Sequence, residues 1–204
     1  HKNRIEDDIA TLESRGVGEA ELIILRDKLN RAATGIVPSE SSIDPSLVEK
    51  LPECTSPIYT TLPADLNQIY EISPLGGIGP PGHTIPTNHM YFHINAGQSS
   101  TKIIDLIAPA DIYITAIASD DDEAAPGRKE YVIKFSVCKD VHGYFNHVKE
   151  LSDELESVIA DVECEQWNTN PGNICQKNIF HKVSAGTVIS GVGHRQGNFD
   201  FGTY

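Results

Sequence analysis

The feature that most constrains the fold is a series of short apolar segments in residues 89–204. These segments are rich in β-branched and aromatic residues, and Gly, Pro or Asp separates one from the next. In chain order they read HMYFHI, STKIIDLIAPADIYITAIAS, EYVIKFSVC, GYFNHV, NIFHKVSAGTVISGVG and NFDFGTY. Short strands of this composition, separated by turn residues, are typical of antiparallel sheets. We therefore predict a mainly β (α+β) domain.

One helix is expected to interrupt the strands after residue 151. Ser152 is suited to cap its first turn, and Asp153 and Glu154 suit its positive end. The apolar residues that follow have helical spacing: Leu155, Val158, Ile159 and Val162. The sequence thus predicts a single helical insertion in the β domain.

The first fifty residues have a different pattern. Apolar residues recur at helical spacing in residues 3–34, with a break at RGVG, which predicts a helical hairpin. The stretch that follows is rich in Pro and Ser and predicts a linker that wraps the next unit. We place the boundary near residue 50, which gives a hairpin and linker in residues 1–50 and a β domain in residues 51–204.

The charge balance excludes several classes of partner. The chain carries 29 acidic and 16 Lys or Arg residues, a formal net charge of -13. Such a surface repels the phosphates of nucleic acids and anionic lipid headgroups. No apolar run approaches the roughly 18 residues that span a bilayer, so we expect no nucleic-acid partner and no membrane insertion of this chain.

The four cysteines match the spacing of no zinc ribbon and no CxxC redox motif. Cys164 and Cys175 flank an NPG turn signal that would bring their sulfur atoms together. A disulfide between them, and hence an oxidising compartment, is the preferred interpretation. Cys138 ends an apolar segment and is equally consistent with a buried thiol.

Residues 79–94, GPPGHTIPTNHMYFHI, hold three of the eight histidines. Alternate side chains of a strand share a face, so His89 and His93 lie on one face of HMYFHI and apolar side chains lie on the other. Because the apolar face already supplies the core, the histidine face is either solvated or a site. Two imidazoles at this spacing can both reach one metal ion. His83 precedes the strand and is interpreted as a loop residue.

The end of the chain supplies further polar groups. Asn198 and Asp200 alternate with two phenylalanines in NFDFGTY, so Asp200 is expected on the polar face of a strand. His147 lies near the end of the strand predicted after VHG.

These motifs, in their order, resemble the lysostaphin-type (LytM-like) zinc metallopeptidases, which cut peptide cross-links of bacterial cell walls. That family has an HxxxD motif, an APADGTV-like strand, a YxHL motif, a V..GQ.IG..G segment and a final HxHFE strand. The corresponding segments here are HMYFH, LIAPADIYITAIAS, HGYFNHVKEL, VSAGTVISGVGHRQG and NFDFG, within residues 74–204. The resemblance implies an antiparallel sheet or sandwich of the lysostaphin-like peptidase (duplicated hybrid motif) type.

The resemblance also implies a zinc site with altered ligands. His93 replaces the Asp of the first family motif and Asp200 replaces the last ligating His, which leaves His89, His93 and Asp200 as the metal ligands. Two imidazoles and a carboxylate suit Zn2+ or another divalent transition metal, with an open position for water. His147 matches the family histidine that positions the water, and Asn198 replaces a family histidine but can still donate to an oxyanion.

Three functions fit these features. The first is a secreted or cell-surface metallopeptidase-like hydrolase of peptide or peptidoglycan, with His147 and Asn198 as catalytic residues. The second is a catalytically degenerate module on the same fold that binds cell-wall glycan, peptide or a protein partner. The third is a cupin-like metal barrel, because His194 and Asn198 have the HxxxN spacing of the second cupin motif, although the first cupin motif is absent.

Overall fold

The structure is a computed structural model of the 204-residue chain. It describes residues 45–77, 87–94, 102–121, 129–169, 172–193 and 197–204. All of these residues belong to one compact unit, Ile43–Tyr204. The predicted helical hairpin and the histidines His83 and His194 lie outside the described residues.

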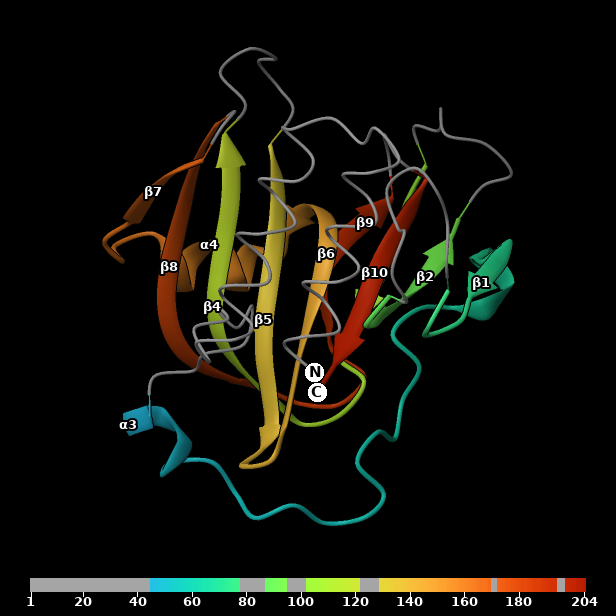
Figure 1. Ribbon diagram of the computed structural model, residues 1–204, viewed down its shortest axis with the longest axis horizontal. Coiled ribbons are helices and arrows are strands. Elements are labelled where there is room, and N and C mark those ends of the chain that lie inside the picture. The colour runs from blue at the N-terminus through green and yellow to red at the C-terminus, as the bar shows by residue number, and fades with distance from the viewer. Residues whose placement is uncertain (1–44, 78–86, 95–101, 122–128, 170–171, 194–196) are drawn as a thin grey trace, which may run out of the picture. The chain divides into compact units, whose positions relative to one another are not determined.

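Ten strands and three short helical segments make up the described unit (Figure 1). The strands are β1 (Glu71–Ser73), β2 (His89–His93), β3 (Ile103–Ile107), β4 (Ile112–Asp121), β5 (Glu130–Cys138), β6 (Val141–Leu151), β7 (Glu165–Thr169), β8 (Gly172–Val183), β9 (Val188–Gly193) and β10 (Asn198–Thr203). The helical segments are α3 (Pro45–Val48), the 3-10 helix η1 (Leu66–Gln68) and α4 (Asp153–Ile159).

The strands form an antiparallel sheet in the order β1-β2-β10-β6-β5-β4-β8-β7, and β9 pairs with both β3 and β6. The prediction of a mainly β, antiparallel domain is therefore confirmed. The sequence patterns do not predict two of the strands: β1, which has only three residues, and β7, which lies between the bonded cysteines Cys164 and Cys175. Both lie at the ends of the strand order.

Strand β6 changes its partner at His147. Its first half pairs with β10, where Asn146 lies opposite Asp200, and its second half pairs with β9, where Val148 lies opposite Val192. Phe145 and Val148 both point into the core although they are three positions apart. In a regular strand, side chains on the same face are two positions apart, so this strand contains one extra residue here. The register with β5 shifts at the same place, and His147 has a φ of 60°. This β-bulge places His147 beside Asn146 on the side away from the core.

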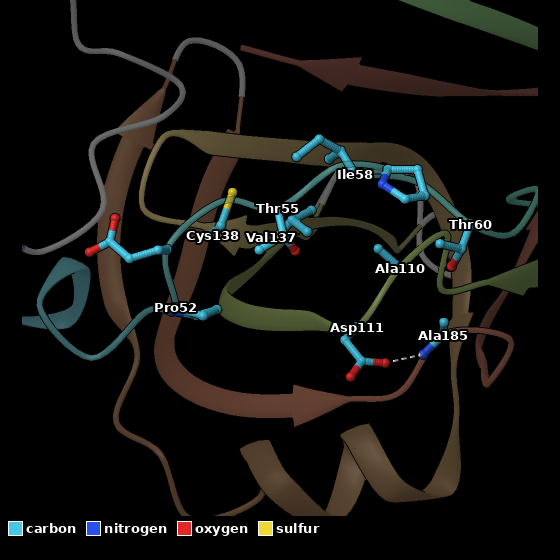
Figure 2. Close-up of a pocket in the computed structure, with 11 residues that line it drawn as sticks. Pro52, Thr55, Ile58, Thr60, Ala110, Asp111, Val137, Cys138 and Ala185 are labelled. Carbon is cyan, nitrogen blue, oxygen red and sulfur yellow. Dashed lines mark hydrogen bonds between the residues drawn. The ribbon is translucent and has the colours of Figure 1, made fainter.

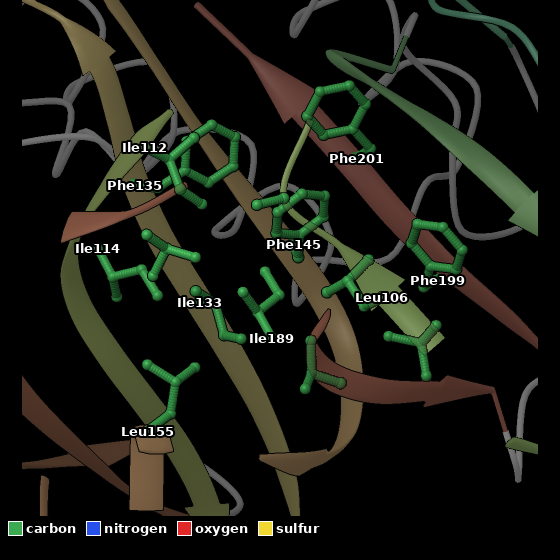
Figure 3. Packing of buried hydrophobic residues seen from close by; sticks show 14 of the residues in the cluster. Leu106, Ile112, Ile114, Ile133, Phe135, Phe145, Leu155, Ile189, Phe199 and Phe201 are labelled. Atoms are coloured by element: carbon green, nitrogen blue, oxygen red, sulfur yellow. The ribbon is translucent and has the colours of Figure 1, made fainter. Parts of the chain in front are cut away.

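Aromatic side chains from neighbouring strands form the centre of the core (Figure 3). The rings of Phe135 and Phe145 stack with centroids 5.0 Å apart, and Phe145 stacks on Phe201 at 5.2 Å. Each buried side chain of this size stabilises the fold by about 1.5–3 kcal/mol. Gly143 makes this packing possible, because a Cβ atom there would lie 2.5 Å from Phe135 Cζ.

The helical insertion forms as predicted. Ser152 is the N-cap of α4, and its Oγ accepts a hydrogen bond of 3.3 Å from the backbone N–H of Leu155. Leu155 is fully buried, and Val158, Ile159 and Val162 pack against the core only in part. The helix therefore covers the edge of the core.

Two disulfides use all four cysteines. The predicted bond Cys164–Cys175 is present. Cys138 is buried, as its apolar context suggested, but it is bonded to Cys54 rather than being a free thiol. The partner of Cys138 lies 84 residues away in the sequence.

The Cys54–Cys138 bond fastens the proline-rich segment that precedes η1 to the β domain. The backbone carbonyl of Pro109 accepts hydrogen bonds from the N–H groups of Thr60 and Thr61, and Pro63 accepts one from Ile107. Residues 52–63 therefore run along the β domain as part of the same compact unit. A pocket of about 390 Å³ lies between this segment and the sheet, and Figure 2 shows the residues that line it. The carboxylate of Asp111, at its rim, accepts a hydrogen bond from Ala185 N–H.

Candidate functional site

Three adjacent strands bring their polar side chains to one face of the sheet. In β2, Phe92 is buried on the core face, as alternation predicted for this strand. Three rows of neighbours cross the opposite face: His89 with Gly202 and Tyr144, Tyr91 with Asp200 and Asn146, and His93 with Asn198. Residues from the start and the end of the β domain therefore form one polar cluster, which consists of His89, Tyr91, His93, Tyr144, Asn146, Asn198 and Asp200, together with His147 at the adjacent bulge.

Asp200 is the centre of this cluster and is only 3% exposed. Asn198 Nδ2 donates to its Oδ1 at 3.3 Å, and Asn146 Nδ2 donates to its Oδ2 at 3.4 Å. Nε2 of His89 lies 3.7 Å from Oδ2, and Nε2 of His147 lies 3.4 Å from the same atom. A positive partner would stabilise the charged form of a carboxylate this deeply buried, because amide hydrogen bonds alone do not balance a buried charge.

His147 lies between two carboxylates. Its Nδ1 is 3.1 Å from Glu130 Oε2 at the start of β5, on the side opposite Asp200. Burial lowers the pKa of His147, but the hydrogen bond to Glu130 and the negative charges of Asp200 and Glu130 outweigh it. The pKa of His147 is therefore raised above its usual value. Because a carboxylate only accepts hydrogen bonds, Nδ1 carries a proton and Nε2 faces Asp200.

The imidazole of His89 is oriented in a similar way. Its Nδ1 lies 2.9 Å from Asn88 Oδ1 and 3.0 Å from the Tyr144 hydroxyl, which itself donates to Asn88 Oδ1 at 3.2 Å. The amide oxygen is an acceptor, so Nδ1 of His89 donates to it and Nε2 is left to face Asp200. Tyr144 reaches His89 across Gly202, where a Cβ atom would lie 2.4 Å from the tyrosine ring.

His93 and Tyr91 occupy the β1 side of the cluster. Nε2 of His93 lies 2.9 Å from the hydroxyl oxygen of Ser73, at the end of β1. The rings of Tyr91 and His93 stack with centroids 6.0 Å apart. Burial and, to a smaller extent, the charge of Asp200 raise the pKa of Tyr91. His93 thus contacts the outer strand, whereas His89 and His147 approach Asp200.

The structure brings four of the five predicted site residues into direct contact around one carboxylate: His89, His147, Asn198 and Asp200. The supporting residues Asn88, Glu130 and Tyr144 were not predicted. Tyr144 and Asn88 are close in sequence to His147 and His89, and a search for polar neighbours would have found them. Glu130 lies 17 residues before His147, and only the register at the bulge brings the two together.

The types of donor atom in the cluster suit a divalent metal ion. Two imidazole nitrogens and one carboxylate form a common zinc set. Among the described residues, however, no group of three or more His, Cys, Asp or Glu side chains is placed so that it could hold a metal ion. Instead, His89 and His147 each contact Asp200 separately.

No protein-family model, curated protein or solved structure matches the chain. Within the described ranges, no helix is both long and apolar enough to cross a bilayer. Functional inference therefore rests on the chemistry of the cluster.

Proposed function

We propose that the polar cluster binds one divalent transition metal ion, with zinc preferred, and that His89, His147 and Asp200 are its ligands. The observation that carries the proposal is the orientation of the two imidazoles. Nδ1 of each ring donates to an oxygen acceptor, so a neutral ring directs the lone pair of Nε2 towards Asp200 Oδ2. A cation among these groups offsets the repulsion between two such lone pairs and the carboxylate, and it is either a proton on His147, which the raised pKa of that ring favours, or a metal ion.

The distances support a metal ion as that cation. Charge-assisted hydrogen bonds from nitrogen to a carboxylate are usually about 2.7–2.9 Å long. The separations here are 3.4 and 3.7 Å, which are longer. Ligand atoms around a tetrahedral zinc ion with bonds of about 2.0–2.1 Å are about 3.3–3.4 Å apart. Binding of one ion would require the three side chains to move so that their ligand atoms surround a single point.

The surroundings of the ligands support the same proposal. Histidines that ligate zinc commonly donate their other ring N–H to a carboxylate or carbonyl group, which fixes the orientation of the ring. Glu130 does this for His147, and Asn88 does it for His89. His147 thereby replaces His93 in the ligand set expected from sequence.

The activity that this site supports best is hydrolysis of peptide bonds in extracellular peptide or peptidoglycan, as in the lysostaphin-type enzymes that the sequence resembles. Bound zinc polarises a carbonyl group and lowers the pKa of a bound water molecule. The amides of Asn146 and Asn198 hold Asp200 in place. The two disulfides support a secreted or cell-surface location.

A binding module on the same fold is the second candidate. Asn198, which replaces a family histidine, donates to Asp200 and supplies no group that exchanges protons near neutral pH. In this case the metal ion would hold β2, β6 and β10 together without catalysis. Zinc binding combined with no cleavage of purified peptidoglycan or its cross-link peptides would favour this candidate.

The first test is zinc content, measured by elemental mass spectrometry on protein without a His tag. We expect about one zinc ion per chain in the wild type and loss of zinc in His147→Ala and Asp200→Asn. His93→Ala should keep the metal, as should the control His181→Ala, whose ring pairs with Glu154 elsewhere. Circular dichroism would check that each variant is folded. A wild type that binds no zinc would contradict the proposal. Loss of zinc in His93→Ala and Asp200→Asn, with zinc retained in His147→Ala, would restore the ligand set expected from sequence.

A further inference from the structure

Exposed apolar side chains are concentrated in one stretch of the chain, residues 62–75. Seven large hydrophobic residues are exposed in the described part of the chain, and five of them come from this stretch. The five are Leu62 (53% exposed), Leu66 (46%), Tyr70 (64%), Ile72 (43%) and Leu75 (62%). The stretch includes η1 and β1. A concentration of this kind on a soluble domain commonly marks an interaction site.

In the described part of the chain, the apolar layer of the sheet ends at β1 with an exposed side chain. Phe199 and Phe92 lie opposite each other with stacked rings and are 0% and 4% exposed, whereas Ile72, opposite Phe92 on the outer side, is 43% exposed. The row of core side chains thus continues to the end of the sheet. One more strand beside β1 would extend this row and cover Ile72.

The other face of β1 is acidic and polar. Glu71 lies opposite His93, and Ser73 lies opposite Tyr91, so both side chains belong to the face that carries the polar cluster. Residues 51–101 contain no Lys or Arg. Glu53 pairs with Lys139 and Asp65 caps η1, so Glu71 is the acidic side chain of this face. The outer side of β1 therefore presents an apolar face and an acidic face.

The edge of β1 can accept another strand. It is an end strand of the sheet, and β2 is its hydrogen-bonded neighbour among the described strands. Added strands gain affinity from backbone hydrogen bonds and specificity from alternate side chains. Because β1 has only three residues, its backbone offers few hydrogen bonds, and side chains must contribute much of the binding.

We propose that the β1 edge, defined by Tyr70, Glu71, Ile72 and Ser73, binds an extended peptide in which apolar residues alternate with Lys or Arg. Its apolar side chains continue the row of Ile72 and Phe92, and its cationic side chains lie beside Glu71. A second copy of this chain is a poor occupant, because two surfaces with a net charge of -13 repel each other. This peptide-binding edge does not depend on the proposed metal site.

The test measures binding of labelled octapeptides by fluorescence anisotropy at physiological salt concentration. The probe consists of four Lys-Val repeats with blocked ends. One comparison peptide has the same composition in two blocks, four Lys followed by four Val, and another has four Glu-Val repeats. We expect the alternating Lys-Val peptide to bind the wild type at least about tenfold more tightly than either comparison peptide.

Two variants of the edge give the sharpest comparison. Ile72→Asp should weaken binding of the Lys-Val peptide about tenfold, and Glu71→Lys should weaken it while creating binding of the Glu-Val peptide. The matched controls are Val188→Asp, at an exposed position of β9, and Glu165→Lys, an exposed glutamate on β7 at the other end of the sheet. Both controls should bind the Lys-Val peptide as the wild type does.

The outcomes separate this inference from the metal site. An exchange of peptide preference in Glu71→Lys, with normal zinc content and unchanged thermal unfolding, would support the peptide-binding edge. An equal loss of binding in Glu165→Lys would overturn it, because general attraction to an acidic protein would then explain the data. Equal binding of the alternating and block peptides, or no binding of either, would overturn it as well, whatever the zinc content.

Discussion

Two histidines on the same strand, His142 and His147 of β6, have opposite shifts of their pKa values. His142 lies near the turn from β5, where its Nδ1 is 3.0 Å from Ser136 Oγ and its backbone pairs with Tyr204. Burial lowers its pKa, and a backbone hydrogen bond and Asp140 oppose this only in part. Burial acts in the same direction on His147, but two carboxylates reverse the result. Burial thus sets the sign of the pKa shift at His142, whereas the two carboxylates set it at His147.

The two ends of β6 are also held by different forces. The His142 end is next to the Cys54–Cys138 disulfide and to the packing of Gly143 on Phe135. The His147 end is a bulge whose polar side chains face Glu130 and Asp200. Covalent and steric constraints fix one end, and electrostatic interactions organise the other. Variants that remove one kind of constraint should therefore leave the opposite end intact.

Removal of the Cys54–Cys138 disulfide should have the largest effect. Its 84-residue separation corresponds to about 4.5 kcal/mol of stabilisation in the chain-entropy model. We expect Cys54→Ser with Cys138→Ser to lower the free energy of unfolding by this amount, measured by urea denaturation, while the folded protein keeps its zinc. The matched pair is Cys164→Ser with Cys175→Ser, for which the 11-residue separation predicts about 2.8 kcal/mol. Equal losses in the two double variants would argue against loop length as the cause.

A methyl group at Gly143 should have the next largest effect. In Gly143→Ala the new Cβ would lie 2.5 Å from Phe135 Cζ and 2.7 Å from the carbonyl oxygen of Gly202, so the core must shift. We expect a loss of about 2–3 kcal/mol in chemical denaturation. Gly186→Ala is the control, because its φ of +82° is strained for alanine but nothing lies within 4 Å, and it should cost about 1 kcal/mol. A Gly143→Ala variant as stable as this control would show that the core adapts easily.

Glu130→Gln should affect the His147 end alone. The amide can still accept a hydrogen bond from His147 Nδ1, but the charge that holds the ring is lost. We expect zinc affinity to fall about tenfold, as measured by competition with a chelator. The control is Glu154→Gln, which makes the same change beside His181. If both variants bound zinc with wild-type affinity, Glu130 would have no part in positioning His147.

The smallest effect expected is the dependence of stability on pH that arises from His142. Its pKa is lower in the folded state than in the unfolded chain, so protonation favours unfolding. The contribution of His142 is complete above the unfolded pKa of about 6.5 and is lost as the pH falls through the folded value. We expect His142→Gln to lose less stability than the wild type between about pH 6.5 and pH 5. Parallel pH profiles of the two proteins would contradict this assignment.

Much of the sheet and part of the cluster were predictable from sequence. Alternation in HMYFH and NFDFG placed His89 and Asp200 on the polar face, because period-2 patterns directly report the two faces of a strand. The contact between Glu130 and His147 was not predictable, because it depends on one extra residue at a bulge. The Cys54–Cys138 bond was not predictable for a related reason. The two cysteines are distant in sequence, and only the completed sheet brings them together.

The Cys54–Cys138 bond also determines which breaks in the chain the proposed site can tolerate. A protease that cuts once between these cysteines leaves two fragments that are still covalently joined. The fragment with His89 then stays attached to the fragment with His147 and Asp200. A single cut between Cys138 and His147 separates the same ligands into fragments that only noncovalent contacts hold together. The order of the cysteines along the chain therefore keeps the fragments joined after a cut within the strands β1 to β5, but not after a cut in the following turn.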